Sequence, residues 1–142
     1  MPNPPKMTPQ RRNPRVGPVY LPASGRTGEP PPWPLGRQTV AEERAWAQLW
    51  ATPQAVAWER LGWTRTVARY CRVMVSSEKP KAPPALLAQA TALEDRLGLT
   101  PKSMRLMLWE IAPDEVAEKR DEAPEERRRT LRAVDPGAVA GS

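Results

Sequence analysis

Apolar residues between about residue 39 and residue 112 recur at helical spacing, in short segments separated by glycine, proline and polar residues. The periodicity predicts helices at about 40–51, 53–61, 65–77, 85–97 and 101–111. No residues in this region alternate between apolar and polar side chains in the way that a half-buried strand requires. The pattern therefore predicts an all-α fold, a small helical domain of about five short helices.

Residues that start and stop helices support these boundaries. Thr39 and Glu42 have the spacing of a capping box at the start of the first helix. Thr52 and Thr100 each precede a proline, which fits the first turn of a helix because no backbone N–H is needed there. Gly98 stands where the fourth helix should end, since glycine adopts the left-handed conformation at little cost.

The last predicted helix is apolar on two sides. One side carries a row spaced i, i+3, i+4 and i+7, which consists of Met104, Met107, Leu108 and Ile111. Leu106 and Trp109 fall on roughly the opposite side. Because a domain of about 74 residues is marginal by itself, a second apolar side predicts a covering partner, and a homo-oligomer is the simplest one.

The two ends of the chain differ from this helical region. Residues 1–38 hold eleven of the 19 prolines and six basic residues against one glutamate, which predicts a disordered Pro/Arg-rich arm. Residues 113–142 carry blocks of charge and few large apolar side chains, which predicts a charged tail that is partly helical or disordered. The helical domain is therefore expected at 39–112.

Tryptophan is unusually frequent for a chain of this length. Five of the six tryptophans lie between positions 46 and 109, and we expect them to fill the core of a small helical domain. The sixth, Trp33, lies in the arm and is expected to dock either on the folded region or on a partner.

The third predicted helix separates apolar from basic side chains. Its apolar row consists of Val67, Tyr70, Cys71 and Met74, and its opposite side carries Arg65, Arg69 and Arg72. The formal net charge of +6 favours polyanionic partners, and guanidinium groups are suited to phosphate contacts. A solvated basic surface explains the same row equally well.

Residues that carry catalysis are scarce. The chain has no histidine, its one cysteine lies on an apolar row, and it has no glycine-rich phosphate-binding motif. Cys71 is expected to behave as a small hydrophobic residue. The sequence therefore predicts a protein that is not an enzyme and that takes neither a metal nor a cofactor. It also lacks an apolar run that could span a membrane, which predicts a soluble protein without a membrane partner.

Residues 86–111 have the spacing of a helix-turn-helix, with a glycine in the turn. However, Glu94 occupies a position four before the glycine, where such motifs usually need a small residue. The second helix offers only Lys102, Ser103 and Arg105 for contacts with bases. The region is therefore a weak match to a sequence-specific recognition motif.

The order of these features resembles the small terminase subunit of tailed bacteriophages. The similarity covers about residues 39–112 and is clearest in the closing segment LGLTPKSMRLMLWEI. The matching positions there are Leu97, Gly98, Leu99, Thr100, Pro101, Arg105, Leu108, Trp109, Glu110 and Ile111.

The resemblance implies a helical protomer of a ring-shaped homo-oligomer in the host cell cytoplasm. Such a ring binds double-stranded viral DNA and delivers it to the large terminase subunit, which holds the ATPase and the nuclease. On this hypothesis Leu106 and Trp109 pack between protomers, and the tails contact the large subunit. The DNA-binding residues would be Arg65, Arg69 and Arg72, together with Arg11, Arg12 and Arg15 of the arm.

Two other functions remain open. A helix-turn-helix transcriptional regulator would bind a defined operator as a dimer instead of a larger ring. A helical scaffold or interaction protein without a nucleic-acid role would bind no DNA, or would show binding that does not weaken with salt.

Overall fold

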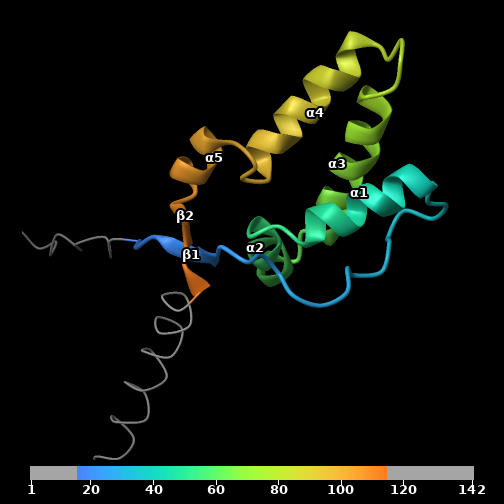
Figure 1. Ribbon diagram of the computed structural model, residues 1–142. Helices are drawn as coiled ribbons and strands as arrows, with labels where there is room; N and C mark the ends of the chain where they lie inside the picture. Colours follow the sequence, from blue (N-terminus) through green and yellow to red (C-terminus); the bar gives the residue numbers. More distant parts are fainter. Residues whose placement is uncertain (1–15, 115–142) are drawn as a thin grey trace, which may run out of the picture.

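The computed structural model describes residues 16–114. In chain order it contains β1 (Val19–Pro22), α1 (Val40–Trp50), α2 (Gln54–Leu61), α3 (Thr64–Ser77), α4 (Pro84–Arg96), α5 (Pro101–Leu106) and β2 (Trp109–Ala112). Helices make up just over half of these residues, and β1 and β2 pair in parallel (Figure 1). The predicted helical character is confirmed, but the strict all-α prediction is wrong because of this sheet.

The first four helices lie close to their predicted positions, and local capping explains part of this agreement. Thr39 accepts a hydrogen bond from the backbone N–H of Glu42, whose carboxylate accepts one from the Thr39 N–H, so the predicted capping box is present. The predicted cap at Thr52 is wrong. Its hydroxyl donates to the carbonyl of Leu49 in the preceding helix, and Pro53 occupies the N-cap of α2.

The fifth helix is shorter than predicted. Thr100 caps it and Pro101 occupies its first turn, as expected, but α5 ends at Leu106. Leu108 then has a left-handed φ of 58°, and the chain is extended from Trp109 onward. These residues adopt an extended conformation instead of a helix because they pair with β1. The spacing of apolar residues cannot reveal a pairing partner near the other end of the chain.

The strand β1 lies in the arm that the sequence predicts to be disordered, so that prediction is wrong for these residues. Its four residues pair with those of β2 in a single register, with Val19 beside Trp109 and Leu21 beside Ile111. Leu21 is fully buried, which gives the strand an anchor in the core. The chain from β1 to α1 then follows the surface of the helices (Figure 1).

A series of edge-on tryptophan rings forms the centre of the core. The ring centroids are 5.1 Å apart for Trp33 and Trp46, 5.4 Å for Trp46 and Trp50, and 5.9 Å for Trp50 and Trp58. Trp58 is fully buried, and its indole N–H donates to the Leu97 carbonyl at 2.8 Å. The predicted core role of these side chains is confirmed, and Trp33 docks on the folded part of its own chain.

The helices α3 and α4 pack against each other, and the turn between them lies far from the sheet (Figure 1). Val67 and Cys71 on α3 are fully buried, as their apolar row predicts, and Ala90 and Leu97 supply the facing side of α4 and its end. This packing fixes the orientation of α3, and it therefore decides which side of α3 faces solvent.

Candidate nucleic-acid interface

Two arginines project from the solvent side of α3. Arg65 and Arg69 are exposed, one turn apart, on the side opposite the buried Val67 and Cys71. Among the described residues, neither takes part in an ion pair or a side-chain hydrogen bond. Their guanidinium groups are therefore available to an external anion, as the apolar–basic pattern of α3 predicts.

The third arginine of the predicted row has a different environment. The Arg72 Nε donates to the Glu42 carboxylate at 2.9 Å, and one terminal nitrogen donates to the Arg37 carbonyl at 2.7 Å. Its guanidinium carbon also lies 5.4 Å from the centre of the Trp33 ring. Arg72 thus fastens the arm and α1 to α3, and we leave it out of the proposed phosphate-contacting pair.

Sequence reasoning missed this role because Glu42 was assigned only to the capping box. Glu42 is 5 % exposed, and its carboxylate serves both the Thr39 N–H and the Arg72 guanidinium. The hydrogen bond from Arg72 is the main cause that lowers the pKa of Glu42, with the Thr39 N–H contributing in the same direction.

The lowered pKa of Glu42 gives a prediction for stability against pH. A carboxylate with a lowered folded-state pKa stabilises the fold above its unfolded pKa of about 4.3, and this stabilisation is lost as the pH falls through the folded-state value. Glu42→Gln should therefore cost about 1–3 kcal/mol at pH 7, and the difference from the unchanged protein should shrink below about pH 4. Urea unfolding between acidic and neutral pH measures it, and a constant difference across that range would contradict the assignment.

A second arginine fastens the arm on the other side of the tryptophan series. Arg26 donates to both carboxylate oxygens of Glu59 on α2, at 3.0 Å each, and its guanidinium carbon lies 5.5 Å from the Trp50 ring centre. The hydrogen bond from Arg26 is the main cause that lowers the pKa of Glu59. Arg26 and Arg72 thus use the same arrangement of guanidinium, carboxylate and indole to hold the chain between β1 and α1.

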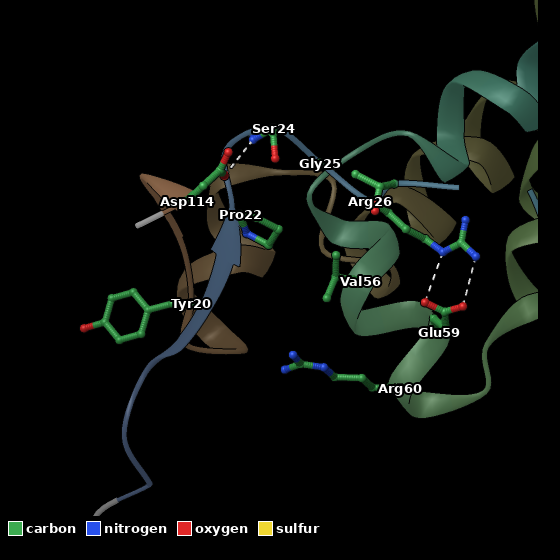
Figure 2. A pocket seen from close by; sticks show the side chains of 10 residues that line it. Tyr20, Pro22, Ser24, Gly25, Arg26, Val56, Glu59, Arg60 and Asp114 are labelled. Atoms are coloured by element: carbon green, nitrogen blue, oxygen red, sulfur yellow. Dashed lines mark hydrogen bonds and ion pairs between the residues drawn. The ribbon is translucent and has the colours of Figure 1, made fainter. Parts of the chain in front are cut away.

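A hollow of about 360 Å³ lies beside Arg26 (Figure 2). Arg26 and Glu59 face each other along one side of it, and the Asp114 carboxylate accepts the Ser24 backbone N–H at 3.2 Å on another. Each of these two contacts joins segments that are distant in sequence. The hollow is therefore a junction between the arm, α2 and the end of β2.

The two residues predicted to pack between protomers lie in different environments. Leu106 is 77 % exposed, so its predicted interface role stays a prediction. Trp109 is 7 % exposed and packs against Trp63, with ring centroids 6.2 Å apart, and against Gly98. The interface prediction is wrong for Trp109, because the strand conformation turns this ring into its own chain.

The remaining predicted DNA-binding residues, Arg11, Arg12 and Arg15, lie outside the described residues. Cys71 is fully buried, as expected, and burial raises the pKa of its thiol to about 12, so it stays a protonated, small apolar group. Among the described residues, no three histidine, cysteine or carboxylate side chains gather as a metal site requires. Within residues 16–114, no helix combines the length and apolar character needed to cross a bilayer.

The helix-turn-helix spacing produces two helices joined at Gly98, but the second is a poor groove reader. The helix α5 has six residues, its Ser103 is buried in the cap, and Met104 packs on the core. Lys102 and Arg105 are its exposed polar side chains of the kind that contact DNA. The short second helix therefore agrees with the weak similarity to a helix-turn-helix inferred from the sequence.

Comparisons of the chain with protein-family models, with curated proteins and with solved structures found no significant match.

Proposed function

We propose that this chain is a small terminase subunit, the oligomeric DNA-binding component of a bacteriophage packaging machine. In this role it recognises double-stranded viral DNA in the host cell cytoplasm and delivers it to the large terminase subunit. The work is non-covalent: guanidinium groups contact phosphates, and the subunit itself needs no cofactor. The observation that carries the proposal is the exposed Arg65–Arg69 pair on α3, in a chain whose closing segment resembles that family.

The local geometry supports phosphate contact in two ways. The side of α3 opposite the arginines is anchored in the core by Val67 and Cys71, so the pair is presented by a rigid element. The formal net charge of +6 adds a long-range attraction to a polyanion, which falls with rising salt.

The test replaces both arginines and compares duplex DNA binding across a salt series. Arg65→Gln with Arg69→Gln should weaken binding about tenfold or more and should lower the slope of log affinity against log salt by about 2, since two phosphate contacts are lost. Fluorescence anisotropy on labelled duplex DNA measures both quantities. The free energy of unfolding should stay within about 0.5 kcal/mol of the value for the unchanged protein, because both side chains are exposed.

A matched control removes two charges from the turn that follows the same helix. Lys79 and Lys81 are exposed at the turn between α3 and α4, so Lys79→Gln with Lys81→Gln makes the same change in net charge. Equal affinities for the two double variants would mean that only net charge matters and would discard the Arg65–Arg69 assignment. Absence of DNA binding by the unchanged protein would instead favour the helical scaffold.

A further inference from the structure

The arm passes directly beside the exposed side of α3. Arg72 lies three residues after Arg69, so its guanidinium continues the row that Arg65 and Arg69 begin. Its terminal nitrogens donate to two carbonyls of the arm, that of Leu35 at 3.4 Å and that of Arg37 at 2.7 Å. These two hydrogen bonds place Arg37 next to the row, although it is distant from the row in sequence.

The backbone around Arg37 is fixed on both sides. Leu35 packs against the core before it, and Thr39 caps α1 after it. Gly36 has a left-handed φ of 72°, which allows the chain to bend so that the carbonyls on either side of it reach one guanidinium. An arginine on such a segment is already placed, so a partner that binds it does not have to order its backbone.

The side chain of Arg37 is available to an external partner. It is exposed, and among residues 16–114 it takes part in no ion pair or side-chain hydrogen bond. The buried carboxylate of Glu42 accepts hydrogen bonds from Arg72, so Arg72 balances its charge. Three guanidinium groups without such a carboxylate partner in the described part of the chain therefore lie around Arg72, and they belong to Arg37, Arg65 and Arg69.

We propose that Arg37 contacts the DNA backbone together with Arg65 and Arg69, and that Arg72 is a positioning residue that holds Arg37 in place for this contact. The inference rests on the proposed DNA-binding function and gives roles to two residues outside the Arg65–Arg69 pair. The ligand class is a phosphodiester backbone, because the planar guanidinium fork matches phosphate oxygens. Contacts of this kind add affinity and salt dependence without reading the sequence of bases.

The dimensions of this surface suit a nucleic-acid backbone. Arg65 and Arg69 are separated by about 6 Å along the axis of α3, and Arg72 lies about 4.5 Å further on. Each strand of B-DNA carries one phosphate per about 3.4 Å of helix axis. A surface of about 10 Å along α3, widened by the arm, therefore faces several phosphates at once.

The first test measures binding of Arg37→Gln to labelled duplex DNA by fluorescence anisotropy across a salt series. Affinity should fall about threefold or more, and the slope of log affinity against log salt should fall by about 1, since one phosphate contact is lost. Arg44→Gln is the matched control. Arg44 is also exposed, and it lies two residues after Glu42, so it points to the other side of α1. Equal effects of the two variants would overturn the assignment of Arg37.

A double-mutant cycle tests the positioning role of Arg72. Arg72→Gln is combined with Glu42→Gln, which leaves no unpaired buried carboxylate and keeps the formal net charge unchanged. This anchor variant should weaken DNA binding as much as Arg37→Gln does. Adding Arg37→Gln to it should then change the affinity and the salt slope little, because the arm no longer holds Arg37 in place. Circular dichroism checks that each variant is folded.

The outcomes separate this inference from the proposed function. Additive losses, with a salt slope lowered by about 2 in the combined variant, would mean that Arg72 contacts phosphate itself and would overturn its positioning role. Weaker binding by the Arg65→Gln, Arg69→Gln variant with unchanged binding by Arg37→Gln would overturn the inference and leave the proposed function standing. Absence of duplex binding by the unchanged protein would overturn both.

Discussion

Trp58→Ala should lower the free energy of unfolding by about 3–5 kcal/mol, the largest loss expected of any single change in this chain. The Trp58 ring is fully buried and packs edge-on against Trp50 at 5.9 Å. Its removal leaves a cavity at the centre of the tryptophan series, and it also leaves the Leu97 carbonyl without its indole donor. Since small domains are stable by about 5–15 kcal/mol, urea unfolding should show a large shift in midpoint.

Trp58→Phe separates the two contributions. Phenylalanine keeps most of the ring volume but lacks the N–H, so the loss should fall to about 1–3 kcal/mol, the cost of the unpaired Leu97 carbonyl with a small packing defect. If alanine and phenylalanine cost the same, the ring contacts contribute little, and the tryptophan series is not the centre of the core.

Gly98→Ala should destabilise the fold by about 2–4 kcal/mol, through two effects that act together. Gly98 has a φ of 74°, which costs an L-residue about 1–2 kcal/mol. It is also buried under the Trp109 ring, and an added Cβ would collide with that ring and displace it from Trp63. Thermal or urea unfolding measures the loss, and the changed tryptophan fluorescence reports the displaced ring.

Gly62→Ala is the matched control for this prediction. Gly62 also follows a helix with a left-handed φ, of 70°, but an added Cβ there meets no atom within contact distance. Its replacement should cost only the conformational part, about 1–2 kcal/mol. The extra loss at Gly98 measures the contact with Trp109, and equal losses at both glycines would show that this contact is unimportant for stability.

Much of the helical framework could be predicted from local pattern. The apolar row of α3, the capping box at Thr39 and the N-cap at Thr100 act over a few residues, and each gave the correct start of a helix or the correct buried side. The exposed Arg65–Arg69 pair followed from the same period. Such features can be predicted from the sequence because their energies depend on residues that are close along the chain.

The errors share a different cause. Trp109, assigned to a helix and to a subunit interface, lies in a strand and in the core, because β1 supplies its backbone partners and Gly98 supplies the space for its ring. The contacts of Arg72 with Glu42 and Trp33 were likewise not predicted, and its DNA-binding role stays a prediction. In each case the deciding partner lies far along the chain and follows no local period.

The sequence by itself therefore determined where the helices begin, which of their sides are apolar, and that the chain is basic. Tertiary structure alone decided that part of the proline-rich arm is a strand, that two arginines fasten that arm to the helices, and that Trp109 lies in the core. The physical reason is the distance along the sequence over which each interaction acts. Helical periodicity and capping are set within a turn or two, whereas strand pairing and ion pairs depend on which distant segments the packed core brings together.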